Sequence, residues 1–461
     1  MISPFIDRDE ERFVLEEEWS SDGGRLIVLY GRRRLGKTRL LFEFSKGKKG
    51  IMYFSEETPV HQQIKGLQEE CARFLNDSLL SDLKIESWSQ LFSYLVKNPP
   101  SKRSYLIIDE FTYLIKADKS VLSALQKAWD NGLSDSKWCI ILSGSILGLM
   151  SELALSYTSP IYGRRTRDIL LEELPFCHAK DFLRQNFEDS MKTYFTIGGV
   201  PEYLQKASEY DTFDEFAKKE LFSKYGYFYR EPYFLLSQEF RELKIYQGIL
   251  RAIANGRTKP SEIASHCGIE TRSLYPYLEG MIRLGFVEKE SPLLGSSRNS
   301  IYNIKDHMLG FWYRYVYPEK GRIETGTFRY EDCILSQYFG AQFEKFIRYE
   351  IAPLIFPGYD TGRWWHKGEE IDFIAINKSS KTIVFGECKY GAKSARDAKR
   401  ILEKLKTKSG LVHAEDGYEI KYALFAGKVN DKESLLKEGY LIYDLDELKR
   451  IFKDTNIWEP N

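Results

Sequence analysis

The 461-residue sequence is poor in the residues that build metal ribbons and disulfide scaffolds. It has six cysteines and six histidines; the cysteines are scattered and none forms a C-x-x-C pair. This distribution argues against a zinc ribbon and a disulfide-stapled fold, and it is typical of a reducing cytoplasm. No apolar run approaches the roughly 18 residues that a membrane span needs, and the charged N-terminal segment predicts no signal peptide. We therefore expect a soluble, cytoplasmic protein with no membrane partner.

The sequence also lacks an excess of charge of either sign, because 67 basic residues balance 67 acidic ones. No global field marks the chain as a nucleic-acid or membrane binder, so any such surface must be local. No internal repeat or low-complexity segment is present. A chain of this length has room for roughly two to four domains with substantial cores.

What is present is a phosphate-binding pattern, G-x-x-x-x-G-K-T, at Gly31–Thr38. It follows an apolar, strand-like run and precedes a helix-forming segment, which is the context that such a loop requires. Glycines let backbone N–H groups wrap an anion, while Lys37 can reach the outer phosphates and the Thr38 hydroxyl can ligate Mg²⁺. The candidate nucleotide-binding residues of this segment are Gly31, Arg32, Arg33, Arg34, Leu35, Gly36, Lys37, Thr38 and Arg39.

Two carboxylates follow a second apolar run, Ser104–Phe111, about 70 residues beyond the phosphate loop. At the carboxyl edge of a parallel sheet, Asp109 can hold the magnesium hydration shell and Glu110 can orient or deprotonate the attacking water. Acidic residues after a strand also serve as simple helix caps, but the spacing favours the second phosphate-site motif of an ATPase.

Two further segments carry candidate catalytic groups. Ser143 or Ser145, at the end of the strand-like run Trp138–Ser145, can reach the γ-phosphate or the attacking water, or can simply cap the next helix. Arg164 and Arg165 precede another apolar run, and one of them is a candidate arginine finger. The alternative is a solvated basic turn.

Several segments together resemble the archaeal-type ATPases, which are relatives of the AAA+ and STAND ATPases. The segments, in chain order, are Phe5–Glu11, the phosphate loop, Leu106–Phe111, Leu142–Ser145, Tyr162–Thr166 and Ile197–Leu204. The resemblance implies ATP rather than GTP, since no N-K-x-D follows the sheet. It also implies that Phe5–Arg8 lies near the adenine and that Gly199-Val200-Pro201 approaches the nucleotide from a helical lid, whereas spacing alone predicts only that Pro201 starts a helix.

From Lys244 the pattern changes to three short helices and two short strands, which predicts a winged helix-turn-helix. Such a module usually lays its third helix in a DNA major groove. The expected DNA contacts are Arg272, Ser273 and Tyr275 to bases, and Arg257, Lys259 and Arg298 to phosphates. The basic excess is slight, so DNA contact and packing against protein remain equal alternatives.

The last part of the chain predicts a second chemistry. Tyr338–Ile355 is expected to be a helix carrying Glu344, and Gly362–Gly391 is expected to form two strands joined by a polar turn at Asn377–Lys381. Hairpin pairing about that turn can bring Asp372 beside Glu387, and strand alternation puts Glu387 and Lys389 on one face. Asp372 and Glu387 would hold Mg²⁺ or Mn²⁺, Glu344 would complete the shell, and Lys389 would position or activate a water.

This constellation resembles the PD-(D/E)xK nuclease superfamily, although Ile371 stands where proline is usual. One branch of the archaeal-type ATPases carries the same tail after the ATPase and winged helix. Taken alone, Glu-x-Lys on a strand is an ordinary charge pair. Trp364 and Trp365 are expected to pack rather than to stack on bases, and His366 alone makes no metal site.

These patterns predict an α/β protein with four parts: a P-loop ATPase core at 1–170, a helical lid at 171–240, a winged helix at 241–317 and a restriction-nuclease-like domain at 318–461. The expected function is an ATP-hydrolysing switch that controls a metal-dependent nuclease acting on nucleic acid. The alternative is a signalling ATPase of the STAND type, whose winged helix and tail bind DNA or protein without cleavage. A helicase is a weaker third possibility. If Arg164 or Arg165 acts across a subunit boundary, ATP should drive formation of a homo-oligomer.

Overall fold

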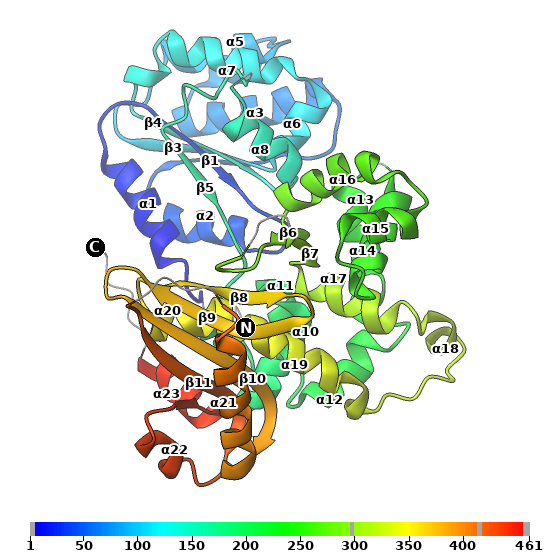
Figure 1. The fold of residues 1–461 in the computed structure, drawn as a ribbon. Coiled ribbons are helices and arrows are strands. Elements are labelled where there is room, and N and C mark those ends of the chain that lie inside the picture. Colours follow the sequence, from blue (N-terminus) through cyan, green and yellow to red (C-terminus); the bar gives the residue numbers. More distant parts are fainter. Residues whose placement is uncertain (1–4, 158, 241, 296–298, 413–416, 455–461) are drawn as a thin grey trace. The chain divides into compact units, whose positions relative to one another are not determined.

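The computed structural model describes residues 5–157, 159–240, 242–295, 299–412 and 417–454 (Figure 1). These residues form two compact units. The first unit runs to Glu173 and includes Val200–Glu202, whereas the second contains Leu174–Gly199 and the chain from Tyr203 onward. Within the described ranges, no helix is both long enough and apolar enough to cross a membrane.

The first unit is built on a five-stranded sheet whose order is β2-β3-β4-β1-β5 and whose neighbours all run parallel. Its strands are β1 (Arg25–Tyr30), β2 (Gly50–Phe54), β3 (Ser104–Asp109), β4 (Trp138–Gly144) and β5 (Arg167–Leu170). The central strands β1, β3 and β4 are mostly apolar and are buried along almost their whole length, because helices cover both faces of such a sheet. The predicted α/β class and N-terminal parallel sheet are confirmed.

Two helices lie on one side of this sheet and the others on the opposite side (Figure 1). Right-handed crossovers explain this division, since the chain moves one way along the sheet from β1 to β2 and the other way in each later step. The first side carries α1 (Asp9–Ser20) and α2 (Lys37–Ser45). The other carries α3 (Val60–Leu75), α5 (Trp88–Lys97), α6 (Phe111–Ala117), α7 (Ser120–Asp130) and α8 (Leu147–Leu155); short α4 is Ser78–Asp82.

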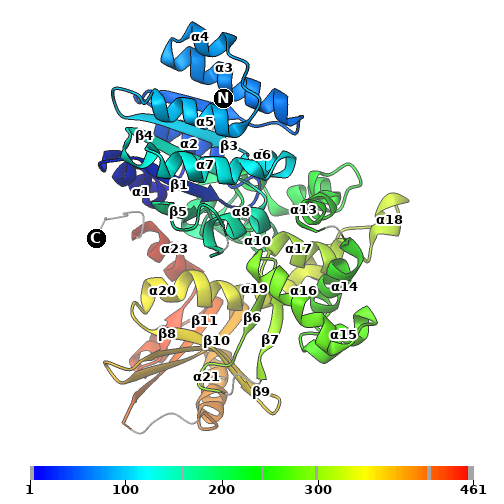
Figure 2. The same ribbon diagram turned by 90° about the horizontal axis from the view of Figure 1, so that it is seen from above.

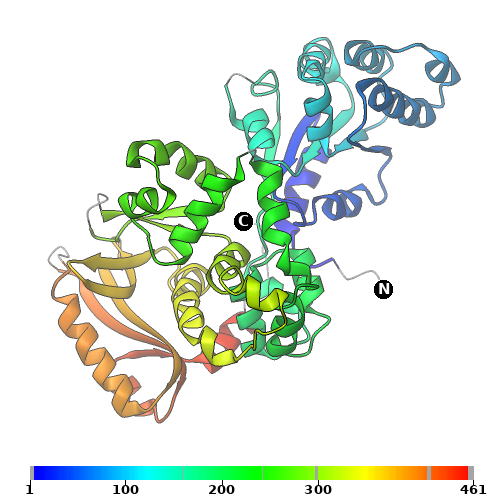
Figure 3. The same cartoon turned by 90° about the vertical axis from the view of Figure 1, so that its right-hand side faces the viewer.

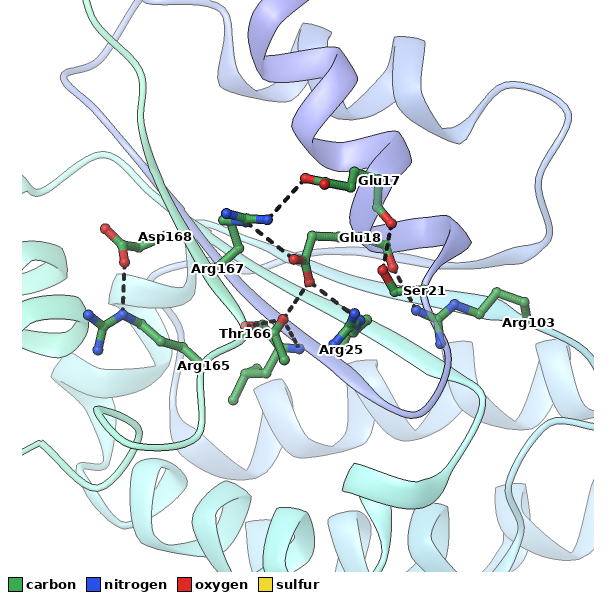
Figure 4. A network of polar contacts seen from close by, with 10 residues as sticks. Glu17, Glu18, Ser21, Arg25, Arg103, Arg165, Thr166, Arg167 and Asp168 are labelled. Carbon is green, nitrogen blue, oxygen red and sulfur yellow. Dashed lines mark hydrogen bonds and ion pairs between the residues drawn. The ribbon is translucent and has the colours of Figure 1, made fainter. Parts of the chain in front are cut away.

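An ionic network fixes α1 to the amino-terminal edge of the sheet (Figure 4). At its centre is the buried carboxylate of Glu18, which lies 3.2 Å from Arg167 Nε and 3.6 Å from Arg25 Nε. The Thr166 hydroxyl donates to the same carboxylate, and Arg103 donates to the Glu18 carbonyl. Because each charge in this half-buried cluster has a partner, the network orders the start of the chain without leaving a charge unpaired.

The second unit begins with one group of helices, followed by a second group of three helices and a strand pair. The first group is α9 (Phe176–Ala179), α10 (Phe187–Ile197), α11 (Pro201–Ala207, entering from the first unit), α12 (Phe213–Phe216) and α13 (Glu231–Glu239). The next is α14 (Leu243–Ala254), α15 (Pro260–Cys267), α16 (Thr271–Arg283) and the antiparallel strands β6 (Val287–Glu290) and β7 (Ile301–Ile304). Pro260 at the first turn and Gly268 in a left-handed conformation (φ 68°) fix the ends of α15.

The end of the chain forms a second five-stranded sheet of order β12-β11-β10-β9-β8. Its strands are β8 (Asp360–His366), β9 (Glu369–Asn377), β10 (Thr382–Lys393), β11 (Glu419–Val429) and β12 (Leu441–Tyr443), with β8, β9 and β10 antiparallel and β10, β11 and β12 parallel. The remaining helices of this unit are α17 (His307–Phe311), α18 (Lys320–Glu324), α19 (Ser336–Phe346), α20 (Ala352–Ile355), α21 (Ala395–Ser409), α22 (Glu433–Lys437) and α23 (Leu445–Asp454). Figures 2 and 3 show α19 and α20 on one side of this sheet and α21 on the other.

The expectation of two strands within Gly362–Gly391 is wrong, because this segment contributes to three. A two-residue turn at Lys367-Gly368 separates β8 from β9, and both residues have positive φ, 49° and 88°. That geometry is typical of a tight hairpin, which usually carries Asn-Gly or Asp-Gly. Lys-Gly is a weaker signal, and the sequence interpretation therefore missed the turn.

Candidate nucleotide site and a second carboxylate cluster

The phosphate loop joins the carboxyl end of β1 to the start of α2. Gly31 passes so close to Leu171 that a Cβ atom would lie 2.5 Å from the Leu171 carbonyl oxygen, so a side chain does not fit there. Gly36 begins α2 in a left-handed conformation (φ 87°) with open space beside it. Lys37 is buried, and its ammonium donates to the carbonyls of Gly31 and Arg32 at 2.8 and 2.9 Å. The loop therefore folds around its own lysine and leaves room beside Gly36.

Thr38 and Asp109 meet directly, since the Thr38 hydroxyl donates to Asp109 Oδ2 at 2.6 Å. Hydroxyl and carboxylate oxygens are the hard ligands that Mg²⁺ accepts, usually with several waters. These two residues lie on adjacent structural elements at one sheet edge, as the sequence predicts for a nucleotide-bound magnesium ion. Their donor set fits that ion.

Glu110 adopts a left-handed backbone conformation (φ 52°) at the start of α6. Its Oε2 atom accepts from the Ser145 hydroxyl at 2.8 Å and from the Ser145 N–H at 3.3 Å. Because β4 lies between β1 and β3, its end brings Ser145 between the phosphate loop and Glu110. Ser145 thus holds the candidate water-orienting carboxylate rather than simply capping a helix.

Ser143 lies two residues earlier and is fully buried at the end of β4. It pairs with Leu29 of β1, and its hydroxyl makes no hydrogen bond within the described residues. A buried hydroxyl without a partner normally needs an explanation such as a ligand. Its candidate role at the nucleotide stays a prediction.

The three arginines of the loop each contact a different neighbour, which the sequence interpretation did not foresee. Arg32 pairs with Glu173 at 3.1 Å, and Arg34 pairs with Glu202 at 3.2 Å. Glu202 directly follows Pro201, so the Arg34 contact brings the Val200–Glu202 segment to the phosphate loop. Of the other two loop candidates, Leu35 is buried, and Arg39 pairs with Glu43 one turn later on α2.

Arg33 reaches the Glu110 side of the site. Its Nη2 atom donates to the Tyr113 hydroxyl at 2.8 Å, and its Nε atom lies 3.4 Å from the Ser145 hydroxyl. The loop is thereby connected through Ser145 to the carboxylate that is expected to orient water. No sequence spacing reports this contact, because it depends on β4 separating β1 from β3.

Arg8 makes contacts that the sequence interpretation did not foresee. It is buried, has a left-handed conformation (φ 76°) and donates to the carbonyl of Glu172 at 2.6 Å. It also lies 3.4 Å from the Leu35 carbonyl. The Phe5–Arg8 segment therefore reaches the phosphate loop, which is compatible with the adenine-side placement that the resemblance implies.

Arg164 and Arg165 lie at the opposite edge of the sheet. They precede β5, which runs parallel to β1 with Arg167 opposite Ile27, so they belong to the amino-terminal edge. Arg164 forms a two-bond ion pair with Asp130 at 2.7 and 2.8 Å, and Arg165 bonds Asp168 at 2.9 Å (Figure 4 shows the second pair). This placement gives no support to a role at the chain's own phosphate loop, so the arginine-finger interpretation stays a prediction for the site of a second copy.

The second sheet brings together the carboxylates that the sequence singled out. Gly386 pairs with Phe373, and this register sets Glu387 beside Asp372 where β9 and β10 diverge. Lys389 Nζ lies 2.9 Å from Glu387 Oε1 and 3.3 Å from Asp372 Oδ2, and the Cys388 N–H donates to the same Asp372 oxygen at 3.0 Å. The ammonium therefore lies between the two carboxylates.

Burial and mutual repulsion shape the charges of this cluster. Burial, and then the neighbouring Asp372, raise the pKa of Glu344 to about 7 and also raise the pKa of Glu387. Burial opposes the charge of Lys389, but Asp372 and Glu387 outweigh it and raise its pKa above the usual value. The second oxygen of Glu387, Oε2, is buried without a hydrogen-bond partner in the described part of the chain.

A metal at this cluster is not shown. Among the described residues, no three His, Cys, Asp or Glu side chains are arranged to hold a metal ion. The orphaned Glu387 oxygen is suited to a cation, but in the structure the cation beside the carboxylates is Lys389. Metal ligation by Glu344, Asp372 and Glu387 therefore stays a prediction.

Ion pairs between side chains connect the β6–β7 pair to this cluster. Glu290 of β6 accepts two bonds from Arg363 of β8, at 2.8 and 2.9 Å, and lies 4.0 Å from Arg348. Arg348, which is buried, donates to the Asp372 carbonyl at 2.9 Å. The strand pair is thus bound to the tail. Arg298, one of the expected phosphate contacts, lies outside the described residues.

Comparisons with known proteins fit the first site. Residues 5–207 match a family described as an ATPase domain predominantly from Archaea, and residues 312–401 match one described as Archaea bacterial proteins of unknown function. An uncharacterized protein of Methanocaldococcus jannaschii, MJECL04, is 34% identical over 454 residues, which cover 96% of this chain and 99% of the relative. The chain belongs to the same protein family as this relative, and its residues 5–207 form an archaeal ATPase domain.

Two other similarities are more restricted. An uncharacterized ATP-binding protein of the same organism, MJ0423, is 49% identical over 48 residues, which are 10% of this chain and 81% of that protein. The solved structure of a Walker-type ATPase of Pyrococcus abyssi aligns with 68% of this chain and 99% of its own chain. The sequence identity is 22% and the TM-score is 0.49. The predicted archaeal-type P-loop ATPase domain is confirmed by the family match.

Proposed function

We propose that this ATPase is an ATP-hydrolysing switch that controls a metal-dependent nuclease site in its tail. The nuclease part of this proposal is supported by the convergence of Asp372, Glu387 and Lys389 at the point where β9 and β10 diverge. Bound Mg²⁺ or Mn²⁺ would polarise a phosphodiester and lower the pKa of a water. Asp372 and Glu387 would hold that ion, Glu344 would complete its shell, and Lys389 would place the water and neutralise the phosphate.

For the first half, Lys37 would hold the outer phosphates, while Thr38 and Asp109 would hold Mg²⁺ and Glu110 would orient the attacking water. Lys37→Ala should lower ATP turnover by more than about 100-fold, measured as phosphate release, because the charge at the transferred phosphate is lost. Lys46→Ala is the matched control, since Lys46 directly follows α2, is exposed and, among the described residues, pairs with Glu43. Equal turnover in both variants would exclude this phosphate site.

The nuclease half is tested on supercoiled, linear and single-stranded substrates with Mg²⁺ or Mn²⁺, with and without ATP. Wild type should cleave at least one substrate, and Asp372→Ala and Lys389→Ala should lose that activity while keeping ATP turnover. The difference in wild-type cleavage with and without ATP shows whether ATP activates or restrains the nuclease. Absence of cleavage with either metal would overturn this half.

A second candidate is a signalling ATPase whose helical module and tail bind a partner without cutting it. One observation favours it: the Lys389 ammonium occupies the position between Asp372 and Glu387 that a metal would share. In this case α14–α16 and the β6–β7 pair act as a winged helix, with Arg272 and Tyr275 exposed on α16. Binding that survives both tail substitutions, without cleavage, is the result expected of this candidate.

A further inference from the structure

Helix α21 carries a row of like charges that its fold does not require. It has six basic and two acidic residues, and Arg396, Arg400, Lys404 and Lys408 recur at every fourth position. We name these four residues the α21 stripe. Side chains four apart are neighbours on a helix, so this arrangement sets like charges side by side, which destabilises a helix. A partner of opposite charge that binds along these four residues would relieve this repulsion.

The stripe faces away from the protein core over most of its length. Ala398, Leu402 and Leu405, on the opposite face of α21, pack against the second sheet. Arg396, Arg400 and Lys404 are exposed. Arg400 pairs with the neighbouring Asp397 at 3.2 Å, but this is a surface pair with 70% and 49% of the respective side chains exposed, and water and salt weaken it.

The far end of the stripe reaches the carboxylate cluster. Lys408 donates to the Glu370 carbonyl at 3.1 Å, two residues before Asp372. Ile383 and Phe385 of β10 pack with Leu405 of α21, and strand alternation puts Glu387 and Lys389 on that same face of the sheet. The cluster and the stripe therefore lie on one side of the second sheet, and the stripe runs along α21 toward the cluster.

We propose that the α21 stripe is a track for the phosphate backbone of a nucleic-acid strand, which it delivers to the Asp372–Glu387–Lys389 cluster. The stripe extends about 18 Å at 1.5 Å per residue. One strand of a duplex carries a phosphate every 3.4 Å or so of duplex axis, so a duplex lying along the track has roughly five phosphates of each strand over that length of its axis. Cations at this density bind a polyanion irrespective of its sequence. The proposal rests on the proposed function for the use of the track, although binding can be measured without cleavage.

The test uses the full chain in EDTA, without nucleotide, and fluorescent 20-nucleotide single-stranded DNA, duplex DNA and single-stranded RNA. Binding is followed by anisotropy across a salt series. The variants are Arg400→Gln, Lys404→Gln and a triple variant that also contains Arg396→Gln. Each lost phosphate contact should reduce the slope of log K against log salt by about 0.7 for a single strand and 0.9 for a duplex. We expect the triple variant to bind more than about tenfold more weakly near 0.1 M salt.

The matched control is Lys406→Gln, which removes an exposed lysine from another face of the same helix. It should leave affinity and slope near wild type, and Arg396→Lys with Arg400→Lys, which keeps the charge, should also retain the slope. A triple variant that binds like Lys406→Gln, or a wild type that binds no probe at low salt, would overturn the track. Thermal unfolding of each variant separates lost binding from lost folding.

Cleavage is scored separately with Mn²⁺. Binding that depends on the stripe, without cleavage, would contradict the nuclease proposal and support the track. If the triple variant cleaves and binds as wild type does, the nuclease proposal is supported and the proposed track is contradicted. The three probes show whether single-stranded DNA, duplex DNA or RNA occupies it.

Discussion

At the scale of single residues, the nucleotide site is more connected than its motifs suggest. The phosphate loop touches Glu202 through Arg34, and it touches Ser145 and Tyr113 through Arg33. Ser145 in turn binds the Glu110 carboxylate. A change at the phosphates can therefore reach the candidate catalytic carboxylate through two side chains, those of Arg33 and Ser145.

Ser145→Ala tests that connection. Loss of its hydroxyl removes the shorter of the two Ser145 bonds to Glu110, so the carboxylate is less well oriented toward water. We expect kcat for ATP hydrolysis to fall about tenfold while KM changes little, because the substitution touches positioning rather than phosphate binding. Steady-state phosphate release measures both constants, and Ser151→Ala on α8 is the control. A rise in kcat would instead identify Ser145 as a restraint on Glu110.

His307 gives the second unit a pH-dependent stability. Burial, and then Lys345, lower its pKa to about 4, so the folded protein holds the ring neutral. The unfolded ring takes up a proton near its ordinary pKa of about 6.5. The stabilisation is therefore complete above pH 6.5 and is lost as pH falls toward 4, by at most about 3 kcal/mol and by less where the ring reaches solvent.

Urea unfolding at pH 7 and pH 5 measures this loss. His307→Phe keeps the ring packing against Tyr194, whose centroid is 5.4 Å away, and it removes the titration. We expect its stability to change less between the two pH values than that of wild type. Replacement of the exposed His61 by Ala should leave the wild-type dependence intact. The prediction fails if wild type and His307→Phe lose equal stability.

At the scale of elements, the sequence predicted individual helices and strands better than it predicted how the strands pair. The strand before the phosphate loop, the Ser104–Asp109 strand and helices α14–α16 could all be predicted, because apolar runs and caps act locally. The Lys367-Gly368 hairpin was missed because its turn residues are unusual. Strands β11 and β12 were missed too, as was the order that inserts β4 between β1 and β3, since spatial neighbours leave no local trace.

The candidate sites divide in the same way. Thr38 and Asp109 could be paired from motif spacing, and Asp372 and Glu387 could be paired from a hairpin expected around one turn. The Arg8, Arg33 and Arg34 contacts could not be predicted, because each depends on the path of a distant segment.

The link between β6 and β8 can be tested as an element. Glu290→Gln leaves Arg363 and the buried Arg348 without their carboxylate, and we expect a local loss of about 1–3 kcal/mol. Hydrogen exchange in β6, β7 and β8 should rise while exchange in the first sheet stays unchanged. The double variant Glu290→Gln with Arg363→Gln should lose less than the sum of the two single variants. Additive losses would mean that the pair does not couple the strands.

At the scale of the whole molecule, the arginines of Tyr162–Thr166 predict assembly. If Arg164 serves the nucleotide of a neighbouring copy, Arg164→Ala subunits keep an intact site but lack the finger, while Glu110→Gln subunits keep the finger. Mixing the two inactive variants with ATP should restore a substantial fraction of turnover, and ATP should increase the particle mass. Asp130→Ala is the control, because it breaks the Arg164 ion pair and keeps the arginine. Failure of the mixture, with both variants folded, would leave Arg164 a structural residue.

The ionic network around Glu18 sets a practical limit on how the ATPase can be divided. A fragment of the first unit that starts beyond α1 would lack Glu17 and Glu18 and would leave Arg25 and Arg167 facing each other at the sheet edge. Like charges without a carboxylate between them repel, and desolvation adds to that cost. An isolated domain intended for expression should therefore begin ahead of Asp9, and a tag is better attached where it does not crowd this edge.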